Sequence, residues 1–174
     1  MANIIPEKGI NFDVYINGSL DSGLAEGNFP SLEAMTSEVK GAGIAGTVDS
    51  IVLGHFQSTT ITLKWRTPPK NFWVLAQHLT HTLDMYAAIQ HYDGSTGLIT
   101  AVPLHVYARA VTKKNSIGDF VVGDGMNSET EHEVYYLKAE LNNQVMLELD
   151  KVNYIYKVHG VDYLAGVRRA LGRG

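Results

Sequence analysis

Residues 60–79 read TITLKWRTPPKNFWVLAQHL, and this stretch decides the fold class. Its first seven residues alternate polar and apolar side chains, which is the period of a β-strand with one buried face. Threonine and tryptophan also favour strands. Pro68 and Pro69 then end the strand, because proline has no backbone N–H to donate to a ladder hydrogen bond. We therefore predict a strand over residues 60–66.

A short helix is predicted directly after the prolines. Its apolar residues recur at the spacing of one helix face, and they are Phe72, Leu75, Ala76 and Leu79. Asn71 precedes this stripe and is positioned to act as its N-cap. The centre of the chain has no other convincing helical stripe. We therefore expect a mostly β protein, an antiparallel β-sandwich or barrel-like fold with one or two short helices.

Further strands are predicted on both sides of this stretch. Residues 10–17 alternate in the same way, and Asn17-Gly18 ends the strand in a hairpin-type turn. Towards the C-terminus, two hairpins are indicated, with strands at residues 82–92 and 97–111, and at residues 130–141 and 144–150. Pro103 predicts an edge position or a bulge in its strand.

The later hairpin and the C-terminus carry more detailed expectations. Tyr135 and Leu137 are predicted to share one face of their strand. Residues 116–127, rich in glycine and aspartate, are the most loop-like segment. At the C-terminus, Asp162 is predicted to cap a short helix that Gly172 ends.

The segment from residue 32 to residue 54 fits neither pattern. In its first residues, neither set of alternate side chains is clearly apolar, so no buried strand face is indicated. Gly41, Gly43 and Gly46 follow. A mobile loop is one interpretation. The other is a hairpin that protrudes from its own core and buries its apolar residues on a neighbouring subunit. Periodicity alone leaves both open.

Composition restricts the class of protein. The 174 residues predict a single domain over 1–174, and 45% hydrophobic residues can form a core without staples. The net charge is −4 and the 14 basic residues are scattered, which argues against a dedicated nucleic-acid-binding face. The absence of cysteine excludes disulfides and thiol chemistry. The first eight residues lack a signal-peptide pattern, so no membrane anchor is expected.

No motif in the chain predicts catalysis or a cofactor. His78, His81 and Asp84 are the nearest approach to a metal site, but the Glu of a metalloprotease helix is missing. No nucleophile elbow accompanies the serines. Asp119 and Asp124 lack the alternating ligands of a calcium loop, and the glycines at 41–46 lack the Lys of a phosphate-binding loop. We expect a protein without enzymatic activity, cofactor or metal.

An ordered set of motifs resembles the major tail tube protein of contractile-tailed phages and of related phage-tail-like bacteriocins. The set comprises Val14-Tyr15-Ile16-Asn17-Gly18, Phe29-Pro30-Ser31-Leu32, Lys40-Gly41-Ala42-Gly43-Ile44, Glu148-Leu149-Asp150-Lys151-Val152-Asn153, Lys157-Val158-His159-Gly160-Val161-Asp162-Tyr163-Leu164 and Arg168-Arg169-Ala170-Leu171-Gly172. The resemblance extends from about Asp13 to Gly172. Two positions depart from it, His159 where Asn is usual and Ile44 where Met is more usual.

The resemblance implies a structural subunit of an inner tail tube. Six copies would form a ring with a β-barrel lumen, and rings would stack into a tube that conducts DNA or penetrates an envelope. It implies a protruding hairpin at 32–54 and a C-terminal contact segment at 151–172. The residues expected at contacts between subunits or rings are Val39, Lys40, Gly41, Ala42, Gly43, Ile44, Val158, His159, Gly160, Val161, Asp162, Tyr163 and Leu164.

The implied partners are further copies of the chain, the tail sheath protein, the baseplate and tail terminator proteins, and DNA in transit if the particle is a phage. The implied location is a virion tail or tail-like particle, assembled in the bacterial cytoplasm. The net negative charge suggests a lumen that repels DNA phosphate. The alternative is a monomeric carbohydrate-binding β-sandwich. It would need exposed aromatic side chains, whereas Trp65 and Trp73 are predicted to lie in the core or a sheet.

Overall fold

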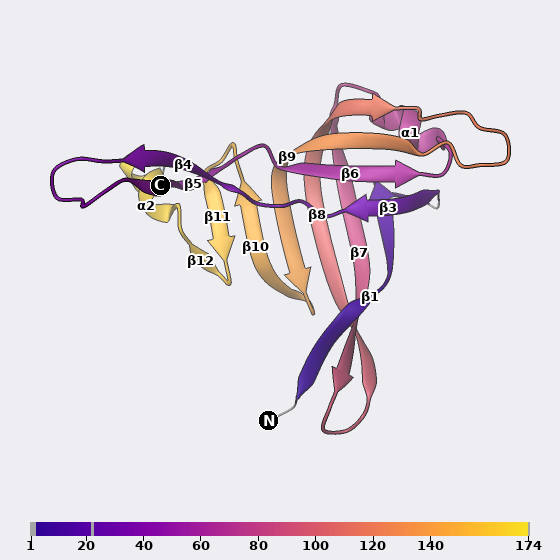
Figure 1. Ribbon diagram of the computed structural model, residues 1–174, viewed down its shortest axis with the longest axis horizontal. Helices are drawn as coiled ribbons and strands as arrows, with labels where there is room; N and C mark the ends of the chain where they lie inside the picture. Colours follow the sequence, from indigo (N-terminus) through magenta and orange to yellow (C-terminus); the bar gives the residue numbers. More distant parts are fainter. Residues whose placement is uncertain (1–2, 22, 174) are drawn as a thin grey trace.

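The computed structural model describes residues 3–21 and 23–173; residues 1, 2, 22 and 174, which the single-domain prediction also includes, lie outside that part. A ten-stranded antiparallel sheet dominates it, in the order β12-β11-β10-β9-β8-β7-β1-β2, with β6 paired to β9 and β3 to β6 (Figure 1). The elements of this sheet are β1 (Ile4–Ile16), β2 (Ser19–Asp21), β3 (Leu24–Asn28), β6 (Thr60–Trp65), β7 (Thr80–Asp93), β8 (Ile99–Ser116), β9 (Ser128–Leu141), β10 (Gln144–Asp150), β11 (Ile155–Val158) and β12 (Val161–Asp162). This arrangement confirms the mostly β, antiparallel prediction.

The sheet divides into two layers at β9, and the core lies between these layers. The first half of β9 pairs with β6, from Ser128 to Glu133, whereas its second half pairs with β10, from Tyr136 to Leu141. In Figure 1 β6 and β3 run across the upper ends of the long strands. Apolar side chains fill the space between the two layers, including Val14, Ile61, Leu63, Trp65, Phe72, Leu75, Leu83, Met85, Val134 and Leu149.

A β-bulge at Tyr135 makes the sheet turn between its layers. The register of β8 against β9 shifts between the Arg109–Tyr136 pair and the Ala110–Val134 pair. One extra residue in a strand moves every side chain beyond it to the opposite face of the sheet. Tyr135 is therefore exposed while Leu137 is buried. The prediction that these two share a face was wrong, because it assumed an unbroken alternation.

The central helix is shorter than its sequence pattern predicted. Helix α1 (Lys70–Leu75) buries Phe72 and Leu75, but Leu79 lies beyond its end and is 60% exposed. Pro69, not Asn71, occupies the N-cap, and no side chain caps the helix. Trp73 is 53% exposed, so its predicted place in the core or a sheet was wrong. Only one face of so short a helix can contact the core.

The remaining strands form a small separate sheet. β4 (Ala34–Val39) and β5 (Val48–Phe56) pair only with each other and extend beyond the main sheet at one end of the molecule (Figure 1). Helix α2 (Ala165–Ala170) lies beside this hairpin near the C-terminus. Its N-cap is Leu164 rather than the predicted Asp162, whose carboxylate instead accepts the Leu164 backbone N–H at 3.0 Å. Gly172 follows α2 with a positive φ of 69°.

Candidate assembly surfaces

The β4–β5 hairpin exposes both of its faces. Its apolar side chains at Met35, Val39, Ile44, Val48, Ile51, Val52 and Leu53 are all exposed. At its tip, Gly41, Gly43 and Gly46 have positive φ values of 146°, 95° and 129°, which other residues rarely adopt. An isolated two-stranded hairpin has marginal stability in water. An apolar hairpin in this setting is therefore expected to be covered by another surface.

The C-terminal segment is held by a tight turn and an ion pair. His159 and Gly160 connect β11 to β12 with φ values of 49° and 80°, the left-handed pair of a type I′ turn. Asn favours this conformation and His tolerates it, so the departure from the family pattern at His159 keeps the turn. Arg168 donates to Asp162 at 2.6 Å, and this hydrogen bond lowers the pKa of the Asp162 carboxyl.

The base of the hairpin and the C-terminal segment pack on each other. β5 bulges between Ile51 and Phe56, and Gly54 within the bulge has a φ of 69°. A Cβ there would lie 2.6 Å from Leu164 Cγ, so the backbone touches this leucine directly. The rings of Phe56 and Tyr156 meet edge to face, with centroids 4.9 Å apart.

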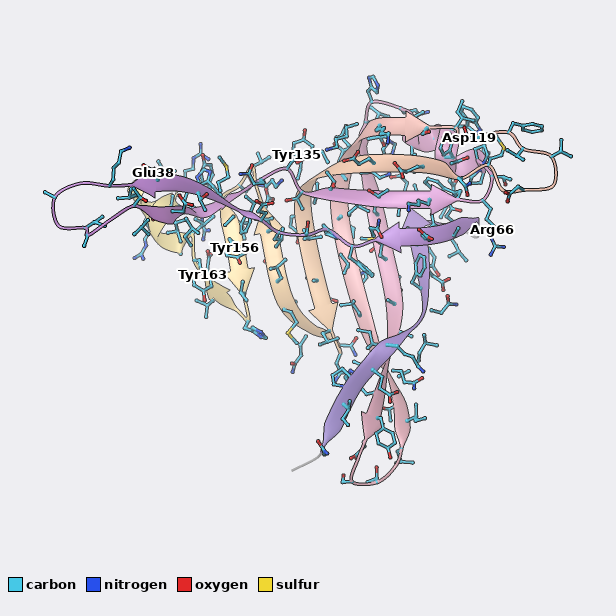
Figure 2. The ribbon with its side chains drawn as sticks, in the orientation of Figure 1. Glu38, Arg66, Asp119, Tyr135, Tyr156 and Tyr163 are labelled. Atoms are coloured by element: carbon cyan, nitrogen blue, oxygen red, sulfur yellow. The ribbon has the colours of Figure 1, made fainter. Side chains whose placement is uncertain are left out.

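A hollow of about 320 Å³ opens beside this contact. We call it the hairpin-base hollow; its lining includes Ile51, Leu53, Phe56, Tyr156, Val158 and Tyr163. Figure 2 shows Tyr156 and Tyr163 together below the hairpin. Its lining is mainly aliphatic and aromatic, which suits an apolar side chain from another molecule.

The structure divides the predicted contact residues between two places. Lys40, Gly41, Ala42, Gly43 and Ile44 lie at the hairpin tip, where Lys40 pairs with Glu38 at 3.0 Å. Of the C-terminal set, Val158, Tyr163 and Leu164 lie at the hairpin base, with Tyr163 exposed and Val158 half-buried; His159, Gly160 and the exposed Val161 form the adjoining β11–β12 turn. Leu164 is only 2% exposed, since it is already packed within its own chain.

The sheet also has a polar face, opposite the core, which the sequence analysis did not predict as one surface. Cross-strand register aligns them in rows: Tyr15, Asp84, Tyr107, Lys138, Glu148 and Lys157; Asp13, Tyr86, His105 and Glu140; and Thr82, Arg109, Tyr136 and Asp150. In each strand, these are the alternate residues that point away from the core. Strand alternation was a sufficient signal to find most of them.

The cations of the polar face are paired with carboxylates. Arg109 contacts Asp150 at 3.3 Å, Lys157 contacts Glu148 at 3.1 Å, and Lys138 contacts Glu140. His105 stacks on Tyr86, with ring centroids 4.2 Å apart, and contacts Asp84 at 2.9 Å. Burial and the neighbouring Glu148 raise the pKa of Tyr136 to about 12, so its hydroxyl stays protonated.

Two of the three residues considered for metal binding have other partners. His81 is buried and its two ring nitrogens contact the Asn17 side chain and the Gln77 carbonyl, both at 3.1 Å. Asp84 contacts His105 instead. Within residues 3–21 and 23–173, no group of three or more His, Cys, Asp and Glu is placed to hold a metal.

No helix in this part of the chain is long and apolar enough to cross a membrane.

The chain is similar to known proteins over nearly its whole length. The model of the family described as phage tail tube protein FII matches residues 6–172. The tail tube protein of Escherichia phage P2 is 26% identical over 173 residues, which cover 97% of this chain and 98% of that protein.

A solved structure, a sheath/tube terminator of an extracellular contractile injection system, aligns with a TM-score of 0.54 and 14% identity. The alignment covers 78% of this chain and 97% of that one. At this identity it shows the shared fold alone.

Proposed function

Since the chain belongs to the phage tail tube protein FII family and is a structural subunit of a tail tube, we propose that six copies close into a ring and that rings stack into a hollow tube. The same family accounts for the absence of a catalytic motif in the sequence. The comparisons give no support to the alternative of a carbohydrate-binding module. The proposal rests on the incomplete strand pairing at the two edges of the large sheet.

One edge of the large sheet is largely uncovered in a single copy, and the other ends in the two-residue strand β12. β1 pairs with β7 along its length, but among the described residues β2 covers only Val14 to Ile16 of its other side. The uncovered part of β1 also exposes Ile4, Ile5 and Ile10. A long apolar edge strand recruits other chains, and a closed barrel removes such edges. A ring in which β1 lies against the β10–β12 edge of the next copy satisfies both edges.

In such a ring we place the polar face toward the lumen. The core and the β3–β6 layer lie on the opposite side of the sheet, which leaves the polar face as the free surface of the long strands. Its Arg and Lys side chains are paired with carboxylates. Free cations are the groups that retain DNA phosphate. Paired ones favour passage of DNA without retention.

We place the β4–β5 hairpin and residues 151–172 at contacts between neighbouring subunits or rings. The exposed apolar side chains of the hairpin and the exposed Tyr163 support this assignment. A heterologous stacking contact extends a tube without limit. The outer layer would then face the tail sheath, and the tube ends would meet the baseplate and tail terminator proteins. The location is a virion tail or tail-like particle assembled in the bacterial cytoplasm.

Electron microscopy of the purified protein in negative stain, across a concentration series, tests the assembly. We expect rings or hollow tubes of uniform width. A chain ending at Lys157 is expected to remain soluble and unable to form tubes, whereas a control ending at Leu171 retains assembly. Tyr163→Ser supplies a point substitution for the case that the shorter chain unfolds. Normal tubes from both the Lys157 truncation and Tyr163→Ser would overturn the contact assignment.

The lumen assignment has its own test. Asp13 lies on the polar face and is exposed, and Asp13→Lys adds a free cation there. Tubes of this variant are expected to retain DNA at low salt, with retention falling as salt rises. Asp13→Asn removes the same carboxylate without adding a cation and serves as the control. Equal DNA retention by both variants and the wild type would contradict the assignment.

A further inference from the structure

The loop between β8 and β9 carries an apolar tip that none of the described residues covers. Phe120, Val121 and Val122 are consecutive, and Phe120 and Val122 are 84% and 93% exposed. Large apolar side chains grouped in this way mark interaction sites more often than neutral surface. The tip belongs to neither the hairpin nor the C-terminal segment, so the contacts proposed above do not account for it.

The tip is held in place by a hydrogen-bonded neck. The Asp119 N–H donates to the Met126 carbonyl at 2.8 Å, and the Met126 N–H donates to the Arg66 carbonyl at 2.6 Å. The Ser128 hydroxyl donates to the Ile117 carbonyl at 2.6 Å. These bonds anchor the loop on β6 and β9. A pre-ordered apolar tip loses less entropy on binding than a free loop does.

The tip and the hairpin-base hollow lie toward opposite ends of the molecule. In Figure 1 the loop extends past α1 at one end, and the β4–β5 hairpin extends past β11 at the other. Figure 2 marks the same separation, with Asp119 at the loop and Tyr156 and Tyr163 near the hairpin. A projection at one end and a hollow at the other can join only between copies, head to tail. This geometry closes rings or extends filaments.

Charge is complementary across the same two surfaces. Asp119 and Asp124 flank the tip, and both are exposed without an ion pair among the residues described. Beside the hollow, α2 carries the exposed Arg169, and Arg173 follows it, its guanidinium 5.1 Å from the Tyr154 ring centroid. Opposite charges at the rim of an interface steer association and set register more than they add affinity.

We propose that the Phe120–Val122 tip of one copy docks in the hairpin-base hollow of a second copy of this chain, with Asp119 and Asp124 facing the arginines of the C-terminal helix region. The inference rests on the proposed assembly and names one of its contacts. The tip alone is too small for a stable interface, which needs on the order of 1,000 Å² of buried surface. It adds a specific anchor to the edge and hairpin contacts.

Cysteine cross-linking tests the contact, because the chain has no cysteine of its own. One variant carries Phe120→Cys and Ile51→Cys, and a second carries Phe120→Cys and Leu53→Cys. All three positions are exposed, so the fold should tolerate the changes. Mild oxidation of assembled protein is expected to give a ladder of linked copies on a denaturing gel. The control pairs Phe120→Cys with Leu98→Cys, which is also exposed, at 62%, near the tip of the β7–β8 hairpin.

The outcomes separate this inference from the assembly itself. Rings or tubes whose Phe120 pairs cross-link no more than the Leu98 control would overturn the docking contact and leave the tube function intact. Protein that forms no ring or tube at any concentration would overturn the proposed ring as well as the docking contact. A ladder specific to the hollow supports the contact. Phe120→Ser should then raise the concentration needed for assembly by roughly tenfold or more, whereas Leu98→Ser should not.

Discussion

Replacing Gly54 by alanine should uncouple the β4–β5 hairpin from the C-terminal segment. The glycine has a φ of 69°, and an added Cβ would lie 2.6 Å from Leu164 Cγ. The left-handed conformation costs a residue with a side chain about 1–2 kcal/mol. Overlap in a packed site adds about 1–3 kcal/mol. We therefore expect Gly54→Ala to reduce the free energy of unfolding by about 2–5 kcal/mol.

A double-mutant cycle isolates the overlap from the backbone effect. Leu164→Ala alone should cost about 2–5 kcal/mol, because it leaves a cavity where a buried leucine packed. In the double variant, removal of the Leu164 side chain leaves room for the Cβ of the alanine at position 54. The loss of unfolding free energy in the double variant should therefore be about 1–3 kcal/mol smaller than the sum of the losses in the two single variants. Urea unfolding of unassembled protein, followed by tryptophan fluorescence, measures all four free energies.

The same cycle can refute the reasoning. Additive losses for Gly54→Ala and Leu164→Ala would show that the two residues do not touch in solution. A loss below about 1 kcal/mol for Gly54→Ala alone would show that the hairpin base adopts another backbone conformation there. Gly9→Ala is the control, because Gly9 has open space around its Cβ position and no positive φ, and it should change the free energy of unfolding by well under 1 kcal/mol.

Three further predictions concern the core and the loop. Burial, and secondarily His81, lowers the pKa of His132 to about 4 from 6.5. The neutral imidazole therefore makes its full contribution to stability above pH 6.5, and the free energy of unfolding should fall by about 3 kcal/mol as the pH drops toward 4. Urea unfolding midpoints measured across this pH range should show the fall, and His132→Gln should depend less on pH. Trp65→Phe removes the indole hydrogen bond to Asp21, 3.0 Å long and buried, so it should cost about 1–3 kcal/mol in urea unfolding; a neutral result would mean that water replaces the indole. Gly118→Ala would drive a Cβ into the Met126 carbonyl oxygen, so amide exchange at Asp119 should speed up at least tenfold, and unchanged exchange would contradict the ordered neck.

The strands were predictable because their alternation is local. Residues 10–17 and 60–66 became β1 and β6 with buried faces at Val14, Ile61 and Leu63. The two C-terminal hairpins also formed; three of their strands are longer than predicted, and β10 has the predicted bounds. Pro103 lies where β9 has ended and β8 pairs only with β7, which is the edge position predicted for it. In these segments each residue's facing depends only on its neighbours.

The misplaced residues share a tertiary cause. The bulge at Tyr135 lets β9 leave one layer for the other, and the alternation on either side contains no mark of the reversal. Helix α1 ends early because the chain must reach β7, although the apolar spacing continues to Leu79. Asp162 serves the Leu164 N–H and Arg168 rather than a helix cap. Each of these depends on a partner distant in sequence or on a required path.

By itself, the sequence determined the fold class and, through an ordered set of motifs, the family; both depend on residue order and local periodicity. Only the tertiary structure decided which surfaces are free. It buried Leu164 against Gly54, aligned the polar face across six strands, and placed the Phe120 tip and the hairpin-base hollow toward opposite ends of the molecule. Exposure is a property of the whole packed chain, since a side chain is covered or free according to segments many residues away.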